Sequence, residues 1–199
     1  MKRLFDIVLA LLLAVFLAPF IVLIAGLILI LDGAPVFYVA ERMKAPNQAF
    51  GLWKFRTMRA SQGDAGVTGG DKSDRITRTG RFLRRLRLDE LPQLWNVLRG
   101  DISFVGPRPP LRLYVEAFPG LYGEVLKSKP GITGLATLVY HRHEARLLQG
   151  CTTPQETDEV YRRACIPRKA RLDLIYQKHQ SVCFDLAILW KTFAKVFFR

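Results

Sequence analysis

The chain has 199 residues, half of them hydrophobic, and a formal net charge of +13 at pH 7. That length allows one domain with a hydrophobic core plus an appendage. Three cysteines without a CxxC pair, Cys151, Cys165 and Cys183, disfavour a disulfide framework or a zinc knuckle. The positive charge favours a polyanionic partner, either nucleic acid, an anionic membrane surface or a phosphorylated substrate, although a generic basic surface has the same composition.

The longest apolar run, residues 4–31, contains one charged residue, Asp6. As one straight helix it would measure about 42 Å, which exceeds the ~30 Å hydrocarbon core of a bilayer. Pro19 lies near the middle of the run and cannot donate to the carbonyl of Val15, so a kink is predicted there. The run is too long for a cleavable signal peptide and lacks a typical cleavage site.

Two membrane topologies remain, a tilted span and a re-entrant hairpin. Basic residues flank the run on both sides, which favours the cytoplasmic face for both ends. Two arms that meet at Pro19 would each reach only ~18–22 Å, enough to enter the membrane and return. These features favour re-entry slightly over a span. Asp6 is expected to pair at helical spacing with Lys2 or Arg3.

The rest of the chain predicts short elements. Strands are expected over residues 36–39 and 50–58, and a mobile Gly/Ser/Asp-rich loop over residues 61–74. A helix is expected to begin near Asp89, with Pro92 in its first turn.

The C-terminal segment also predicts a helix. Its aliphatic stripe, expected in the core, is Val182, Leu186, Leu189, Phe193 and Val196. Candidates for contact with the membrane interface are Trp190, Phe197 and Phe198.

Two adjacent acids, Asp89 and Glu90, directly follow a segment, residues 75–87, with six arginines and no acid. An anionic nucleophile can attack a diphosphate only after arginines and a divalent cation neutralise the phosphate oxygens. A carboxylate held beside such groups can then form an acyl-phosphate intermediate. Taken alone, the pair is equally explained as a helix N-cap with ordinary surface ion pairs.

Two turn-like stretches accompany the acid pair. In GPRPP, residues 106–110, Arg108 lies between prolines that restrict its backbone and present its side chain at low entropy cost. In KPGITG, residues 129–134, turn amides could bind an anion. A solvated arginine and a plain turn are the simpler alternatives.

The segment LDELPQLWNVLRGDISFVGPRP, residues 88–109, resembles the signature of the bacterial sugar transferases, the monotopic phosphoglycosyl transferases. Further blocks match that family in order: KRLFDIVLA, PVFYVAERM, LWKFRTM, KPGITGLA and RLDLIYQKHQSVCFDLAILWKTF. Several collinear blocks over nearly the whole chain are far more specific than one motif.

The resemblance implies a reaction. Such an enzyme moves a sugar-1-phosphate from a UDP-sugar to polyprenol (undecaprenyl) phosphate, releases UMP, and uses Mg²⁺ and a covalent phosphosugar on the aspartate that corresponds to Asp89. Glu90 is implied as its partner, in metal binding or acid–base work, and the two acids are the implied metal ligands. The implied substrate-binding residues are Lys54, Arg56, Arg84, Arg108 and, for a family arginine that follows Thr137, Arg142 with Arg146 as the alternative.

The resemblance also implies an α/β fold and a place in the cell. Residues 1–33 would form a re-entrant membrane helix broken at Pro19, and residues 34–199 a small mixed α/β catalytic domain at the cytoplasmic face of the bacterial inner membrane. The implied partners are a UDP-sugar, polyprenol phosphate and inner-membrane phospholipids, without nucleic acid, and a homodimer is left open. The reaction would be the first membrane step of exopolysaccharide or glycoconjugate synthesis.

Some positions depart from the family pattern. Ala18 replaces a frequent serine before the proline, and the segment from residue 141 to 165 is typical of a subgroup at most. His141 and His143 could share a face of a strand and bind a metal, although two histidines alone are a weak signal.

Two other functions remain as alternatives. A membrane-tethered basic module that binds anionic lipid or nucleic acid without catalysis would explain the charge and the apolar run, but not two acids inside the basic cluster. The chain also lacks the interleaved aromatic and basic residues that suit base stacking. An inert scaffold partner in a glycan assembly complex is the third possibility.

Overall fold

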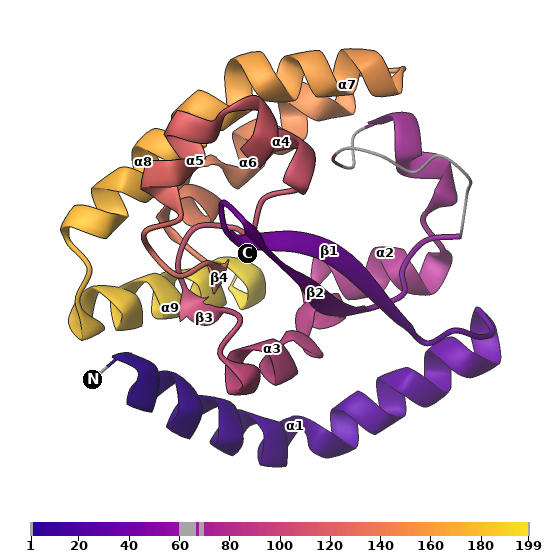
Figure 1. Cartoon of the computed structure of the whole chain (residues 1–199). Coiled ribbons are helices and arrows are strands. Elements are labelled where there is room, and N and C mark those ends of the chain that lie inside the picture. Colours follow the sequence, from indigo (N-terminus) through magenta and orange to yellow (C-terminus); the bar gives the residue numbers. More distant parts are fainter. Residues whose placement is uncertain (1, 60–66, 68–69, 199) are drawn as a thin grey trace.

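The computed structural model describes residues 2–59, 67 and 70–198. Figure 1 shows a long helix, α1 (Lys2–Leu31), along one side of a mixed α/β domain, which confirms the predicted fold class. The other elements, in chain order, are β1 (Phe37–Ala45), β2 (Gln48–Phe55), α2 (Arg78–Arg85), α3 (Gln93–Arg99), β3 (Ser103–Val105), α4 (Arg112–Ala117), α5 (Pro119–Val125), β4 (Gly131–Thr133), α6 (Leu135–Gln149), α7 (Pro154–Val160), α8 (Ile166–Lys178) and α9 (Val182–Phe197).

Shorter turns join these elements. Gly70–Arg75 and Leu88–Glu90 are 3₁₀ helices, and a π-helical turn, Tyr161–Cys165, joins α7 to α8. The loop predicted over residues 61–74 falls mostly outside the described residues.

The strands pair in two separate two-stranded pieces. β1 and β2 form an antiparallel ribbon, and β3 and β4 pair in parallel, with Ser103 opposite Gly131. The first strand extends well beyond the predicted residues 36–39, to Ala45. Its second half was missed because Glu41, Arg42 and Lys44 interrupt the hydrophobic pattern while Ala40 and Met43 face the core.

Helix α1 remains helical through Pro19, and Figure 1 shows it bent near its middle. The predicted break at Pro19 is therefore a bend rather than a loop, as expected when proline removes one hydrogen bond from a helix whose other bonds persist. By length and composition, α1 is the one helix in the described part of the chain that could cross a membrane.

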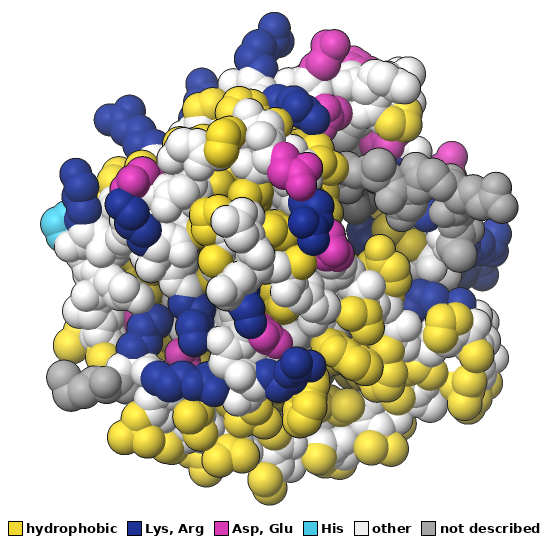
Figure 2. All heavy atoms as spheres, in the orientation of Figure 1, with side chains coloured by type: hydrophobic (Ala, Val, Ile, Leu, Met, Phe, Trp, Pro, Cys, Tyr) yellow, Lys and Arg dark blue, Asp and Glu magenta, His cyan; other side chains and the backbone are white. Residues whose placement is uncertain are grey.

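Both halves of α1 pack against the domain. In the first half, Ala10 is buried with Leu94 and Val97 of α3. In the second half, Ile24 and Ile28 are buried with Phe55 of β2 and Leu83 of α2. One face of α1 is exposed along the helix, with Val15 at 79% and Phe16 at 70%, whereas Leu13, Ala14 and Leu17 are partly buried against the domain. Figure 2 shows the result as a band of hydrophobic side chains along the α1 side of the molecule.

Charged residues at the start of α1 bind the domain rather than one another. Arg3 donates to the carbonyls of Val97 and Leu98, at 2.5 and 2.7 Å. Asp6 is buried and accepts hydrogen bonds from the Ser103 hydroxyl and the Phe104 amide, at 3.0 and 3.3 Å. The predicted pairing of Asp6 with Lys2 or Arg3 is therefore wrong, because the domain offers its own partners.

Helix α9 buries a different face from the predicted one. Asp185 and Ile188 are its fully buried residues, whereas Leu186 and Phe193 of the expected core stripe are about half exposed. Asp185 lies in the core because it accepts a hydrogen bond from Tyr176 at 2.6 Å and pairs with Lys2 of α1. Trp190 and Phe198 are exposed, as expected, and the side chains of Val196 and Phe197 lie outside the described residues.

The β3–β4 pair fixes the proline-rich loop, residues 106–110, that carries Arg108. The amide of Gly131 donates to the carbonyl of Pro107 at 2.8 Å, and the amide of Gly106 donates to the carbonyl of Thr133 at 2.9 Å. A Cβ at Gly106 would lie 2.2 Å from the carbonyl oxygen of Lys129. The turn predicted over residues 129–134 is thus a strand, and its glycines permit the close backbone approach that holds the loop in place.

Candidate active site

The two acids lie in the 3₁₀ turn Leu88–Glu90, between α2 and α3. The predicted helix begins later than expected, at Gln93, with Pro92 as its cap, so the acids precede the helix rather than occupy its first turn. Arg87 has φ +57°, a left-handed conformation that costs about 1–2 kcal/mol outside glycine. That residue redirects the chain, and both acids turn inward, with Asp89 only 9% and Glu90 only 8% exposed.

The Glu90 carboxylate forms ion pairs with positive side chains from three segments. Its Oε1 lies 3.4 Å from Lys54 Nζ of β2 and 3.3 Å from both terminal nitrogens of Arg108. Its Oε2 lies 3.3 Å from a terminal nitrogen of Arg87. A buried carboxylate is retained only when such partners compensate its lost hydration. The structure therefore brings together Lys54, Glu90 and Arg108, which the sequence had assigned to one site.

The pKa of Glu90 reflects these neighbours. Burial alone would raise it, but the charges of Lys54, Arg108 and Arg87 outweigh burial and lower the pKa to about 2. Burial also lowers the pKa of Lys54, against the opposing effect of Glu90. Glu90 is thus ionised at any physiological pH, which fits an electrostatic or ligand role better than proton transfer.

Asp89 has a different environment from its neighbour. Its carboxylate has no hydrogen-bond partner among the described residues, and burial, followed by the charge of Glu90, raises its pKa. The charges of Lys54 and Arg84 oppose this rise. Arg84 is held by a hydrogen bond from its Nε to the Thr57 hydroxyl at 2.9 Å. A buried carboxylate with free oxygens beside cations is a suitable nucleophile or metal ligand.

Two predicted binding residues have other surroundings. Arg56 donates to the carbonyls of Asp32, Gly33 and Ala34, so its guanidinium holds the connection from α1 to β1. Arg142 is exposed on α6. Neither is brought to the acid pair. Arg56 follows Lys54 by two positions, but it lies just past the end of β2, beside the connection whose carbonyls its guanidinium binds.

The two histidines do not form a metal site. They lie on helix α6 rather than on a strand, and His143 contacts Arg168 at 3.3 Å and the ring of Tyr140. His141 faces the other way, where desolvation and the charges of Arg87 and Arg108 lower its pKa. No cluster of three or more metal-binding side chains occurs in the described part of the chain.

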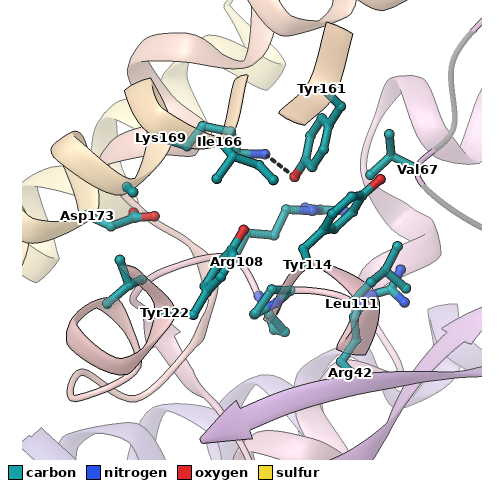
Figure 3. Close-up of a pocket in the computed structure, with 14 residues that line it drawn as sticks. Arg42, Val67, Arg108, Leu111, Tyr114, Tyr122, Tyr161, Ile166, Lys169 and Asp173 are labelled. Carbon is teal, nitrogen blue, oxygen red and sulfur yellow. Dashed lines mark hydrogen bonds between the residues drawn. The ribbon is translucent and has the colours of Figure 1, made fainter. Parts of the chain in front are cut away.

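A pocket adjoins the acid pair through Arg108, which lines it (Figure 3). Several of its side chains were missed by sequence reasoning, because they come from α4, α5, the π-helical turn and α8 and share no local motif. The lining includes Arg108, Tyr122, Tyr161, Lys169 and Asp173. The sequence shows the tyrosines and the charged residues, but it does not show that their side chains lie around one pocket.

We expect the substitution Glu90→Gln to lower the pKa of Asp89. It removes the negative charge that helps raise that pKa, and it leaves the charges of Lys54 and Arg108 without their nearest counter-ion. Carbon NMR titration of carboxyl-labelled aspartate would measure the shift. Glu116→Gln, at an exposed position on α4, is the matched control and should leave the titration of Asp89 unchanged. An Asp89 pKa that stays the same or rises in Glu90→Gln would contradict this electrostatic coupling.

Comparison with known proteins identifies the family of this chain. The model of the bacterial sugar transferase family matches residues 1–199. The chain is 36% identical over 201 residues to the UDP-glucose:undecaprenyl-phosphate glucose-1-phosphate transferase of Escherichia coli (strain K12), a match covering 99% of this chain and 40% of that protein. It is 35% identical to the uncharacterized sugar transferase EpsL of Bacillus subtilis (strain 168), over 98% of this chain and 87% of that protein.

A third relative acts on another sugar. The chain is 32% identical to the UDP-N-acetylgalactosamine-undecaprenyl-phosphate N-acetylgalactosaminephosphotransferase of Aeromonas hydrophila, over 96% of this chain and 42% of that protein. The chain thus spans about 40% of the length of these two longer relatives. The family match nevertheless extends over the whole chain, including α1 and the acid pair. The chain belongs to the bacterial sugar transferase family.

Proposed function

We propose that the chain is a phosphoglycosyl transferase that moves a sugar-1-phosphate from a UDP-sugar to polyprenol (undecaprenyl) phosphate and releases UMP. The observation that carries the proposal is the buried acid pair, in which Glu90 is compensated by three cations while Asp89 keeps free carboxylate oxygens. The names of the Escherichia coli and Aeromonas hydrophila relatives support the same donor class and lipid carrier. Because those names differ in the sugar, they leave the sugar of this chain open.

The first half-reaction uses Asp89 as the nucleophile. One oxygen of its carboxylate attacks the phosphorus that bears the sugar, and the bond from that phosphorus to the bridging oxygen of the diphosphate breaks. UMP leaves with the electron pair, and the sugar phosphate remains on Asp89 as an acyl phosphate. Burial and the charge of Glu90 raise the pKa of Asp89, which makes its carboxylate more basic than an exposed one, and the charges of Lys54 and Arg84 oppose that rise.

The second half-reaction regenerates the carboxylate. A phosphate oxygen of the polyprenol phosphate attacks the same phosphorus, and the bond to Asp89 breaks. The product carries the sugar on a polyprenol diphosphate. Each half-reaction needs the same electrostatic support, because charge develops on oxygens around one phosphorus in both.

Three cationic side chains supply that support. Lys54 and Arg108 already contact Glu90, and Arg84 is oriented toward Asp89 by its hydrogen bond to Thr57. Arginine forks bind phosphate oxygens in a bidentate manner, whereas lysine acts as a point charge. Glu90 holds these cations in place and, with a pKa of about 2, does not carry a proton.

The two acids also fit Mg²⁺. Their carboxylate oxygens are the ligands that Mg²⁺ prefers, and a site with only one or two protein carboxylates is typical of an ion completed by substrate phosphates and water. The described residues offer no third acidic or histidine ligand, which agrees with an ion that arrives with the diphosphate. Asp89 and Glu90 would hold it, and when bound it would neutralise charge on the diphosphate.

Helix α1 supports a location at the membrane. Its exposed hydrophobic face, with both halves of the helix packed on one domain, fits a re-entrant helix better than a span. Figure 2 also shows Lys and Arg side chains close to the hydrophobic band, as suits contact with anionic phospholipid headgroups. The proposed location is the cytoplasmic face of the bacterial inner membrane, where the enzyme would begin exopolysaccharide or glycoconjugate synthesis.

Cysteine labelling would test the re-entrant topology. In a Cys183→Ser background, a single cysteine added before Met1 should react with a membrane-impermeant maleimide in inverted vesicles. The exposed native Cys183 of α9 provides the matched control for the domain side. Both cysteines should be labelled from the same side, because both halves of α1 contact the domain. Labelling of the added cysteine only in right-side-out spheroplasts would show that α1 spans the membrane.

UMP release would test the proposed reaction. Detergent-solubilised protein with polyprenol phosphate and Mg²⁺ should release UMP from one member of a UDP-sugar panel. Asp89→Asn should reduce release by at least about 10⁴-fold, because an amide cannot replace the attacking carboxylate. Asp89→Asn must also keep its melting temperature, so that lost activity reports the chemistry.

The matched control is Asp74→Asn, an exposed acid outside the site, which should keep full activity. Native-level UMP release by Asp89→Asn would contradict the nucleophile assignment. If no donor reacts and the protein instead binds nucleic acid with steep salt dependence and without Mg²⁺, the non-catalytic basic module would replace this proposal.

A further inference from the structure

The pocket beside the acid pair is partly open to solvent and has polar and aromatic side chains in its lining. Figure 3 shows Tyr122, Tyr161, Lys169 and Asp173 around it, on α5, the π-helical turn and α8, with Arg108 extending across it. Arg108 is the link to the acid pair, because its guanidinium also lies 3.3 Å from Glu90. A donor whose diphosphate lies at Arg108 could therefore place an adjoining ring in this pocket.

Asp173 has no role in holding the fold by hydrogen bonds. Its side chain lines the pocket, the residue is only 7% exposed, and its carboxylate has no hydrogen-bond partner among the described residues. Burial, opposed by Lys169, raises its pKa to about 7. The carboxylate therefore keeps its capacity to accept hydrogen bonds from a ligand in the pocket.

Other polar groups line the same pocket as Asp173. The Tyr122 hydroxyl has no hydrogen-bond partner among the described residues. Lys169 Nζ donates to the Tyr161 hydroxyl at 3.2 Å, a bond drawn in Figure 3, and to Glu144 of α6 at 2.8 Å. The pocket thus offers a carboxylate acceptor, two phenol hydroxyls, an ammonium donor and aromatic faces.

This set of groups suits a ring with several hydroxyls. Each ring hydroxyl can donate to a carboxylate and accept from a phenol or an ammonium, whereas a nucleobase presents fewer groups in a fixed donor–acceptor pattern. Tyrosine rings also cover the apolar face of such a ring. Pockets of this kind commonly combine aromatic walls with a few polar groups that fix the orientation of the ligand.

Two rings of a UDP-sugar carry hydroxyls, the ribose and the sugar itself. In the proposed reaction the sugar phosphate stays on the protein through both half-reactions, while UMP leaves and the lipid phosphate enters. The walls of the pocket suit the part that stays, and its open side suits the parts that exchange. The sugar is also joined through its anomeric oxygen to the phosphorus that Asp89 attacks, so it must lie near the acid pair.

We infer that Asp173, Tyr122, Tyr161 and Lys169 bind the sugar ring of the donor and determine which sugar is accepted. The inference rests on the proposed function. Glu144 of α6 positions Lys169, and Tyr161 lines the pocket, so the segment from residue 141 to 165 contributes to the choice of sugar through these two residues. The substrate class is a nucleoside-diphosphate hexose, with specificity set by the configuration of its ring hydroxyls.

The test compares Asp173→Asn with the native chain on donors that differ at one ring hydroxyl, such as UDP-glucose and UDP-galactose. Loss of a hydrogen bond to a charged group should lower kcat/KM for the preferred donor about 10- to 100-fold. The preference between the two donors should change by at least about 5-fold. Inhibition by UMP should change by less than about 2-fold, because UMP lacks the sugar.

Two further variants keep the test decisive. Tyr122→Phe removes only a hydroxyl and should lower kcat/KM about 3- to 10-fold, again without weakening inhibition by UMP. Glu124→Gln, an exposed position on the same helix as Tyr122, is the control and should match the native chain. Parallel weakening of donor and UMP would assign the pocket to the nucleoside and overturn the inference. Unchanged kinetics in both pocket variants would also overturn it.

Failure of the proposed function gives a different result. In that case the native chain releases no UMP from any donor, and calorimetry on the native chain then tests the pocket by itself. UDP-sugar binding that is tighter than UDP binding, and that loses this advantage in Asp173→Asn, would retain the pocket assignment. Equal binding of UDP and UDP-sugar by the native chain would overturn it.

Discussion

The ion pairs of the buried Glu90 carboxylate are the interaction on which the rest of the site depends. They join β2, the turn after α2 and the proline-rich loop at one point, through Lys54, Arg87 and Arg108. Breaking a buried pair typically costs 3–5 kcal/mol, whereas an exposed pair is worth about 0–1 kcal/mol. Lys54, only 16% exposed, is therefore the stronger structural partner, and Arg108, at 41%, is the one more available to a phosphate. Burial, together with the charge of this carboxylate, raises the pKa of Asp89 and so separates the two acids into a fixed anion and a reactive one.

Neighbouring residues of one strand or one helix connect α1 with the site. Phe55 packs against α1 with Ile24 and Ile28, while Lys54, the preceding residue of β2, reaches Glu90 from the opposite face of the strand. Leu83 of α2 packs in the same cluster, and the next residue, Arg84, binds Thr57. The elements that rest on α1 therefore also carry the cations of the site, which suits an acceptor whose phosphate lies at the membrane surface.

Sequence reasoning succeeded where chemistry is encoded locally. Charge and proline patterns mark the acid pair, Arg84 and Arg108, and the family resemblance added Lys54; in the structure Lys54 and Arg108 both contact Glu90. It did not find the structural role of Arg56, which depends on three carbonyls of a distant connection, or the buried face of α9, which depends on Tyr176 and Lys2. Sequence reasoning also did not single out Asp173, because only the folded structure shows that this helical residue lines a pocket.

The central claim is that Asp89 carries the sugar phosphate between the two half-reactions. The most direct measurement is intact-protein mass spectrometry of the native chain after mixing with its UDP-sugar and Mg²⁺, without polyprenol phosphate. We predict a mass increase equal to one sugar phosphate, located on the peptide that contains Asp89, with one equivalent of UMP released and no increase in Asp89→Asn. UMP formation only when polyprenol phosphate is present, with no adduct on the protein, would show direct transfer between the substrates and contradict the claim.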